Sequence, residues 1–397
     1  MVSAMFRLLA VVVFLLAGCV AAFAQGGTIT IQGQAGTFPT IQSAIDAVPS
    51  GGTVIVDGGN HAENLLITKG VQLLGRNSPV LNPVSGTPIF INNPSGSVQV
   101  ISFVLTIPAN QIGINYDAVA SAVQTGTILN CSFNGGTNSI FAREANFRVV
   151  GNVFVNFSAT AVVVKGVVGS TSRQLRVSSN SFAGNAGAGQ PLSSAITTTD
   201  GTIQVDNNLI LNVKNGVLVS KCAGKVASNE FTNAQAGMDI SDSPALLAEH
   251  NNLGTSSSFS AVFNALGFTT FGLRLIRSTG AIVRNNTFNS GNSGIIVTQQ
   301  STGVTVEANV VRNMATSPLG GGTGIVLSIS SFAEVHNNNI ENNAFGLQVV
   351  NASADASDNW WGAVNGPSGA GGGSGNSISA GVPFLPFLVA PNPNAGA

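Results

Sequence analysis

The chain has 397 residues, of which 8% are charged, and its formal net charge at pH 7 is −1. This balance excludes the strong electrostatic footprint with which proteins bind nucleic acid or anionic membranes, so neither is an expected partner. With 48 glycines and 44% hydrophobic residues, the composition favours a β structure with many tight turns over a doubly wound or helical enzyme.

Residues 1–24 are predicted to be a secretion signal. Arg7 supplies the positive charge, Leu8–Leu16 the short apolar region and Ala22-Phe23-Ala24 the cleavage site. The alternative is a lipoprotein anchored through Cys19, because Leu16-Ala17-Gly18-Cys19 resembles a lipobox. Either way we expect an exported protein that is secreted, periplasmic or extracellular. No later apolar stretch approaches the roughly 20 residues that span a bilayer.

Residues 25–70 are predicted to form an N-terminal cap and the first strands. Ile41, Ala44, Ile45 and Val48 share one face of an amphipathic helix. A Pro-Ser-Gly-Gly turn follows this helix and leads into an apolar run. A helix in this place covers the open end of a stack of repeats, whose terminal units need a cap.

Residues 71–361 carry an internal repeat of the form V-x-x-N-x-F. Its asparagines are separated by between 21 residues, from Asn208 to Asn229, and 35 residues, from Asn251 to Asn286. Such periods are typical of a solenoid. Upstream, the register is predicted to continue through Leu74, Ile101 and Cys131, and these three positions with the nine asparagines define twelve rungs. The asparagines are Asn152, Asn180, Asn208, Asn229, Asn251, Asn286, Asn309, Asn338 and Asn359.

The second half of each rung reads G-I-x-V, as in Gly294-Ile295-Ile296-Val297. These are short alternating strands entered through a glycine turn. A leucine-rich repeat is excluded, because its fixed leucine positions are occupied here by Val, Ile, Phe or Ala in different rungs. We therefore predict parallel sheets around one core, with one inward asparagine per rung hydrogen-bonded to the asparagines above and below it.

The chain resembles the right-handed parallel β-helix proteins of the pectin-lyase-like superfamily over nearly all of residues 28 to 390. The repeat, the entry phrase Thr37–Arg76 and the closing phrase Asp358–Gly369 carry this resemblance. It implies an all-β, single-stranded right-handed parallel β-helix with an N-terminal helical cap. Residues 362–397 are then a C-terminal cap with a Pro/Gly-rich tail, and Trp360 and Trp361 seal the end of the core.

The resemblance also implies a broad association with carbohydrate, but it does not carry an activity. The Gln-Asp and Arg-Pro-Trp motifs of pectin methylesterases are absent. So are the calcium-binding acids and the Arg-x-Pro-x-x-Arg of pectate lyases, and the Asp-Asp pair of polygalacturonases. A shared fold alone does not assign a function.

The best candidate site is a patch of six charged residues at equivalent positions of neighbouring rungs. In the catalytic interpretation, an aspartate or lysine is the general base and an arginine stabilises the charge on a uronate. In the structural interpretation, opposite charges pair across adjacent strands. We expect a secreted protein that binds polysaccharide or a cell-surface partner, and the alternative is a polysaccharide lyase or glycoside hydrolase that uses this patch. Its residues are Asp200, Lys221, Asp239, Asp242, Arg274 and Arg277.

Three further features complete the prediction. A second column of equivalent positions alternates in sign and is expected to form a solvated salt ladder. Its residues are Asp206, Ala227, Glu249, Arg284, Glu307 and His336.

Insertions after Asn180, Asn251 and Asn309 leave the same corner of the solenoid. The insertion after Asn251 carries Phe259, Phe263, Phe268 and Phe271, which form either a lid or an apolar patch. No metal, cofactor or disulfide between Cys131 and Cys222 is expected, and the protein is predicted to be a monomer.

Overall fold

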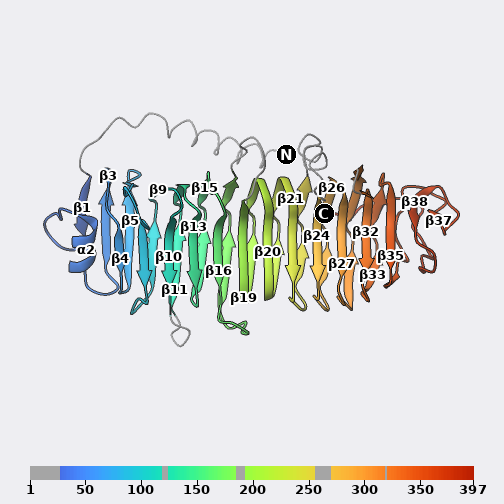
Figure 1. The fold of residues 1–397 in the computed structure, drawn as a ribbon, viewed down its shortest axis with the longest axis horizontal. Helices are drawn as coiled ribbons and strands as arrows, with labels where there is room; N and C mark the ends of the chain where they lie inside the picture. Colours follow the sequence, from blue (N-terminus) through green and yellow to red (C-terminus); the bar gives the residue numbers. More distant parts are fainter. Residues whose placement is uncertain (1–26, 119–123, 185–192, 255–269, 318–319) are drawn as a thin grey trace. The chain divides into compact units, whose positions relative to one another are not determined.

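The computed structural model describes residues 27–118, 124–184, 193–254, 270–317 and 320–397. The predicted signal peptide, its cleavage site and Cys19 lie outside the described residues, as do Phe259, Phe263 and Phe268. Two compact units are present, residues 27–163 with Ser179–Phe182 and residues 164–178 with 183–397. We call them unit 1 and unit 2; Figure 1 labels the strands that belong to them.

Unit 1 is a stack of parallel strands that form three faces. We number the faces in the order in which the chain enters them after helix α2 and β1. The first face holds β2 (Thr53–Asp57), β5 (Val71–Arg76), β8 (Val98–Ile101), β11 (Thr125–Leu129) and β14 (Asn146–Val150). The second face holds β3 (Asn60–His61), β6 (Val80–Leu81), β9 (Val104–Ile107), β12 (Ser132–Gly135), β15 (Val153–Val155) and β18 (Ser181–Ala183). The third face holds β4 (Leu65–Ile67), β7 (Ile89–Asn92), β10 (Ile112–Asp117) and β13 (Asn138–Arg143).

Unit 2 repeats the three faces, with β19 (Ser194–Asp206), β20 (Leu209–Ala227) and β21 (Glu230–Ser241) long enough to run through corners. Its first face continues through β17 (Gln174–Ser178), β22 (Leu247–Glu249), β25 (Ile282–Arg284), β28 (Val304–Glu307), β33 (Phe332–His336) and β36 (Ser353–Asp355). The second face has β23 (Asn252–Gly254), β26 (Thr287–Gly291), β29 (Val310–Met314) and β34 (Asn339–Glu341). The third has β24 (Phe271–Ile276), β27 (Ser293–Thr298), β32 (Thr323–Ser328), β35 (Phe345–Val350) and β38 (Gly375–Ile378).

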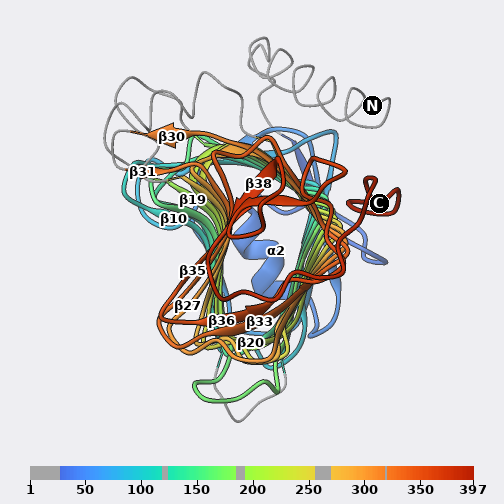
Figure 2. The same ribbon diagram turned by 90° about the vertical axis from the view of Figure 1, so that its right-hand side faces the viewer.

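The remaining described strands are β1 (Thr28–Ile31), β16 (Thr160–Lys165), β30 (Thr316–Ser317), β31 (Gly320–Gly321) and β37 (Pro367–Gly369). β1 pairs antiparallel with β2. In the view along the stacking direction, the strands within a unit overlie one another and enclose the core (Figure 2). The predicted all-β parallel β-helix is confirmed.

The predicted N-terminal cap helix is also confirmed. Helix α2 (Ile41–Ala47) begins at Thr40, whose side chain accepts a hydrogen bond from the backbone N–H of Ser43 in a capping box. Ile41, Ala44, Ile45 and Val48 are at most 2% exposed. α2 packs on β1, β2 and β4, so its apolar face closes the first rung of unit 1.

The core is formed by the inward positions of the stacked parallel strands. On the third face of unit 2, one such column is fully buried, and each side chain in it contributes about 1.5–3 kcal/mol by leaving water. Its residues are Val217, Met238, Leu273, Ile295, Ile325 and Leu347. In unit 1 three phenylalanine rings stack instead, with centroids 4.9 Å apart for Phe133 and Phe154 and 4.8 Å apart for Phe154 and Phe182.

The glycine of G-I-x-V is required by the close approach of successive rungs. A Cβ on Gly237 would lie 2.5 Å from the carbonyl oxygen of Gly272, and one on Gly272 would lie 2.3 Å from a ring carbon of Phe288. Side-chain atoms cannot occupy either position. The repeated glycine therefore reflects packing density rather than a turn conformation at this position.

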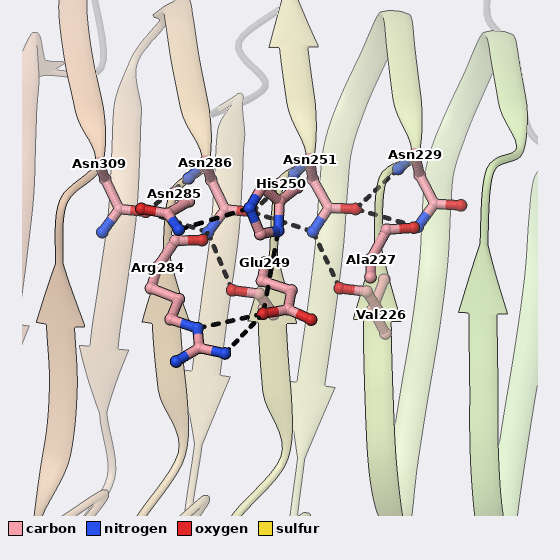
Figure 3. Close-up of polar contacts among 11 residues, drawn as sticks. Val226, Ala227, Asn229, Glu249, His250, Asn251, Arg284, Asn285, Asn286 and Asn309 are labelled. Atoms are coloured by element: carbon pink, nitrogen blue, oxygen red, sulfur yellow. Dashed lines mark hydrogen bonds and ion pairs between the residues drawn. The ribbon is translucent and has the colours of Figure 1, made fainter. Parts of the chain in front are cut away.

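The predicted asparagine ladder is confirmed in atomic detail (Figure 3). Asn229 donates from its backbone N–H and from its side-chain Nδ2 to Oδ1 of Asn251, at 3.1 and 2.9 Å. Asn251 does the same to Asn286, and Asn286 to Asn309. All four side chains are at most 1% exposed, so the ladder satisfies polar groups that would otherwise be buried without partners.

The predicted upstream register is correct at Cys131 and wrong at Leu74 and Ile101. Cys131 donates its backbone N–H to Asn152 Oδ1 at 2.8 Å, as a ladder residue does. Leu74 pairs with Ile101, and Ile101 pairs with Leu129, inside the first face. The ladder corner is instead occupied by Phe103 and Pro79, whose carbonyls accept from Ser132 and Val104.

The C-terminal region closes unit 2. Trp361 is fully buried and Trp360 is 8% exposed, so the predicted burial of both is confirmed. The tail then runs back over the last rungs: Asp358 donates its backbone N–H to the carbonyl of Pro386 at 2.6 Å, and Gly396 donates to that of Ala308 at 2.8 Å.

Candidate functional site

The corner between the third and first faces of unit 2 presents a charged or amide residue on five successive rungs, and Ile329 occupies this position on the next rung. These residues have positive φ angles between 48° and 54°, a backbone conformation that is uncommon outside glycine. Their stacking follows from the register, in which Gly201 pairs with Cys222 and Ser241 with Ile276. The predicted column is thus present, and it consists of Asp200, Lys221, Asp242, Arg277 and Gln299.

Beyond this corner, inward-facing residues on four successive rungs build a second ladder. Cys222 donates its backbone N–H to Ser243 Oγ at 3.1 Å, Ser243 donates to Ser278 Oγ at 3.3 Å, and Ser278 donates to Ser301 Oγ at 3.1 Å. All four residues are at most 1% exposed. This serine ladder fixes the backbone of the corner, so the outward side chains are held one above another.

Two pairs of opposite charge connect β21 and its corner to β24. Arg277 binds Asp242 through Nε and Nη2, at 2.7 and 2.9 Å, and its Nη1 donates to Gln299 Oε1 at 2.6 Å. Arg274 binds Asp239 through Nε and Nη2, at 3.0 and 2.5 Å. Both pairs are bidentate, which fixes the orientation of each guanidinium.

The Arg277 guanidinium holds the pKa of the Asp242 carboxyl below its usual value, and Lys221 acts in the same direction. Hydrogen bonds and charge both favour the ionised carboxylate. A carboxylate held in this state does not donate a proton near neutral pH, so it is a poor general acid. It is a good acceptor for hydroxyl groups.

The other two predicted residues do not join these pairs. Asp200 is 8% exposed, and its Oδ1 accepts the backbone N–H of Gly169 at 2.9 Å. Lys221 forms no ion pair within 4.0 Å among the described residues. Of the predicted patch of six, the structure therefore joins Asp239 with Arg274 and Asp242 with Arg277, whereas Lys221 stays outside these pairs and Asp200 anchors a turn.

Phe271 belongs to this surface, although the sequence placed it in a loop. It is the first residue of β24, and the guanidinium carbon of Arg274 lies 4.7 Å from its ring centroid. This distance is that of a cation–π contact. The position directly before Gly272 of the repeat was the signal that places Phe271 on a strand. We call Asp239, Asp242, Phe271, Arg274 and Arg277 the paired-charge face.

The second predicted column has the expected register and is partly ion-paired. Glu249 binds Arg284 at 2.9 Å on the neighbouring strand, and His250 lies 3.9 Å from the same carboxylate. Figure 3 shows this cluster beside the asparagine ladder. Glu307 and His336 follow in register. Within the described ranges, no group of three or more His, Cys, Asp or Glu side chains could hold a metal ion.

Because its folded-state pKa is lowered, Asp242 stabilises the protein above the pKa of the unfolded chain, and this stabilisation is lost as the pH falls through the folded pKa. Arg277→Ala is therefore expected to raise the pKa of Asp242 toward its ordinary value. The stability difference between wild type and variant is expected to shrink in acid. Carboxyl titration by NMR, with urea unfolding at several pH values, measures both. An unchanged Asp242 titration in the variant would contradict the pairing.

No described helix is long and apolar enough to cross a membrane. Both described cysteines, Cys131 and Cys222, are free and buried.

Comparison with solved structures supports the fold. A mannuronic acid specific polysaccharide family 6 lyase from human gut microbiota superimposes with a TM-score of 0.62 at 13% identity, over 81% of this chain and 84% of the lyase. The catalytic unit of a GH87 α-1,3-glucanase from Streptomyces thermodiastaticus superimposes with a TM-score of 0.61 at 16% identity, over 84% and 70%. At such identities the likeness concerns the fold alone.

A sequence relative is a cell surface glycoprotein of Methanothermus fervidus. It is 30% identical over 102 residues, which make up 25% of this chain and 17% of the glycoprotein. The chain thus spans less than a fifth of that relative.

The model of the right-handed β-helix region matches residues 87–253 and 193–360. These two overlapping matches cover well over half of the 397 residues, and they include both the asparagine ladder and the paired-charge face. The chain therefore belongs to the right-handed β-helix family.

Proposed function

We propose that this protein is exported and binds polysaccharide through the paired-charge face of unit 2. The observation that carries the proposal is two bidentate contacts on the same two neighbouring rungs, Asp239 with Arg274 and, three residues further along the chain, Asp242 with Arg277. The arginine side chains are 36% and 50% exposed. Guanidinium donors and carboxylate acceptors therefore stand next to one another in fixed positions.

This arrangement suits sugar hydroxyl groups, each of which can donate one hydrogen bond and accept others. The four charges cancel, so the face favours hydroxyl-bearing polymers without requiring that they be charged. Ion pairing orients the side chains before a ligand binds, and preorganisation reduces the entropy lost on binding. Phe271 beneath Arg274 adds a fixed apolar element to the same surface.

Binding is favoured over catalysis because of the state of the carboxylates. A glycosidase of the usual kind needs one protonated acid and one carboxylate facing the scissile bond. On this face each aspartate is held by an arginine, and the pKa of Asp242 is lowered rather than raised. A lyase or hydrolase acting with the same residues is the alternative that the experiment must separate.

The test uses purified residues 25–397 on affinity gels containing pectin, polygalacturonate, alginate, xylan, glucans and bacterial exopolysaccharides. We expect retardation by at least one polymer, with no new reducing ends and no ultraviolet-absorbing products. Arg274→Ala and Arg277→Ala should each weaken retardation about tenfold, the order for a lost charge-assisted hydrogen bond.

Arg143→Ala is the matched control, because Arg143 forms an equally exposed bidentate pair with Asp117 in unit 1. It should leave retardation unchanged. Cleavage of a polymer that disappears in Arg277→Ala would instead make the protein an enzyme. Absence of binding to every polymer would direct attention to protein partners.

A further inference from the structure

A second cluster of polar side chains lies on the first face of unit 2, away from the paired-charge face. Arg176, Gln204 and Lys225 occupy the same outward position of three successive strands, β17, β19 and β20. The residues that flank them along each strand, such as Val177, Val205 and Val226, point into the core. At a strand spacing of about 4.8 Å, the two cationic residues stand about 10 Å apart with Gln204 between them.

A buried carboxylate organises this column. Asp206 is 9% exposed, and it accepts hydrogen bonds from Ser178 Oγ, from Gln204 Nε2 at 3.1 Å and from Asn207 Nδ2 at 3.2 Å. Ser178 Oγ in turn accepts from Arg176 Nε at 2.9 Å. Ser178 thus links Arg176 to the carboxylate, and Gln204 is fixed with its amide nitrogen turned toward Asp206.

Arg176 and Lys225 remain able to bind an anion. Asp206 forms no ion pair within 4.0 Å, and neither do Arg176 and Lys225, among the residues that the structure describes. In that part of the chain, the terminal nitrogens of Arg176, the ammonium group of Lys225 and Oε1 of Gln204 have no hydrogen-bond partner. Glu249, next to Ala227 in register, is bound by Arg284.

Arg176 differs in this respect from the four arginines that form ion pairs. Arg143, Arg274, Arg277 and Arg284 are each neutralised by an acidic residue on the neighbouring strand. Arg176 is held in place by a neutral hydroxyl instead, so its orientation is fixed while its charge stays available. Lys225 supplies a second cation across Gln204.

We propose that Arg176, Gln204 and Lys225 form a subsite for an acidic sugar. The carboxylate or sulfate group of the sugar binds between the guanidinium and the ammonium groups, and a sugar hydroxyl donates to Gln204 Oε1. Bidentate guanidinium contacts suit the planar carboxylate and the tetrahedral sulfate alike. The inference rests on the proposed function only in that its ligand is also a polysaccharide.

The test compares wild-type residues 25–397 with Arg176→Gln and Lys225→Gln on three affinity gels. Polygalacturonate presents carboxylates, dextran sulfate presents sulfates and a neutral glucan presents neither. We expect each variant to bind an acidic polymer about tenfold more weakly, with binding to the neutral glucan unchanged. Wild-type binding to the acidic polymer should also fall as salt is raised. The acidic polymer that shows the loss identifies the anion.

Arg312→Gln is the matched control, because Arg312 is exposed on the second face and forms none of the described ion pairs. Thermal unfolding of each variant shows whether it folds, and Arg176→Lys, which keeps the charge, should recover part of the binding. Equal losses in Arg312→Gln, or none in the Arg176 and Lys225 variants, would overturn the inference.

The two proposals fail differently. If the wild type binds only neutral polymers and depends on Arg274, this inference is wrong and the proposed function stands. If acidic polymers bind through Arg176 and Lys225 while Arg274→Ala has no effect on any gel, the acidic subsite stands and the paired-charge face does not bind the polymer.

Discussion

Replacing Asn286 with alanine is expected to lower the free energy of unfolding by about 3–5 kcal/mol. Oδ1 of Asn286 accepts from the backbone and side chain of Asn251. Its Nδ2 donates to the carbonyls of Ala248 and Arg284 and to Asn309 Oδ1. Alanine removes these side-chain hydrogen bonds and leaves the buried backbone N–H of Asn251 without its acceptor. A buried polar group without a partner costs about 1–3 kcal/mol. Urea unfolding of residues 25–397 measures the loss.

Asn285→Ala is the control, one residue away. Asn285 lies on the outside of the same corner and contacts His250 Nε2 at 3.4 Å, so its loss is expected to change stability by less than about 1 kcal/mol. Equal effects of the two substitutions would mean that the corner conformation, and not the ladder, stabilises this turn.

Phe154→Ala is expected to cost about 3–5 kcal/mol. The ring of Phe154 is fully buried and lies between Phe133 and Phe182, nearly parallel to both, with interplanar angles of 15° and 7°. Alanine removes both stacking contacts and leaves a cavity that the stacked backbone cannot close. The measurement is urea unfolding together with amide hydrogen exchange of β12 and β15, which should exchange faster in the variant.

Phe154→Leu separates the two causes of this loss. Leucine fills most of the space but does not stack, so it should cost much less than alanine if the cavity dominates. A leucine variant as unstable as the alanine variant would assign the loss to ring stacking.

The asparagine ladder could be predicted from the sequence because its chemistry allows few residues. A buried position that must accept two hydrogen bonds and donate others selects asparagine. Asparagine therefore recurs at a regular spacing that is apparent in the sequence. The serine ladder uses a smaller side chain that is common throughout the sequence, so its repetition does not stand out. The spacing was the available signal, since Ser243 to Ser278 and Asn251 to Asn286 are both 35 residues apart.

The misplaced register at Leu74 and Ile101 has a physical cause. Where Phe103 and Pro79 replace asparagine, the corner no longer carries a distinctive polar residue. The apolar run before it then offers several equivalent alignments. Inward and outward alternation in a strand fixes a face but not the position of the turn that ends it.

For the charged patch, the sequence predicted which residues share a column but not which of them pair. Periodicity placed Asp242 beside Arg277 and Asp239 beside Arg274. It could not indicate that Asp200 turns to the backbone of Gly169, because that contact depends on a loop one rung earlier. The Arg176–Lys225 column could not be predicted for a similar reason, because it depends on the direction in which the side chains of Ser178 and Gln204 turn toward Asp206.

Cys131 and Cys222 each replace the usual ladder residue, one in unit 1 and the other in unit 2. Burial raises the pKa of the Cys131 thiol to about 12 and also raises that of Cys222, so neither forms a reactive thiolate while its rung stays closed. In the chain from residue 25 onward, each unit thus contains one buried cysteine that a reagent can label only when the unit opens. The rate at which a thiol reagent labels either cysteine under native conditions reports how often that unit opens, without any introduced probe.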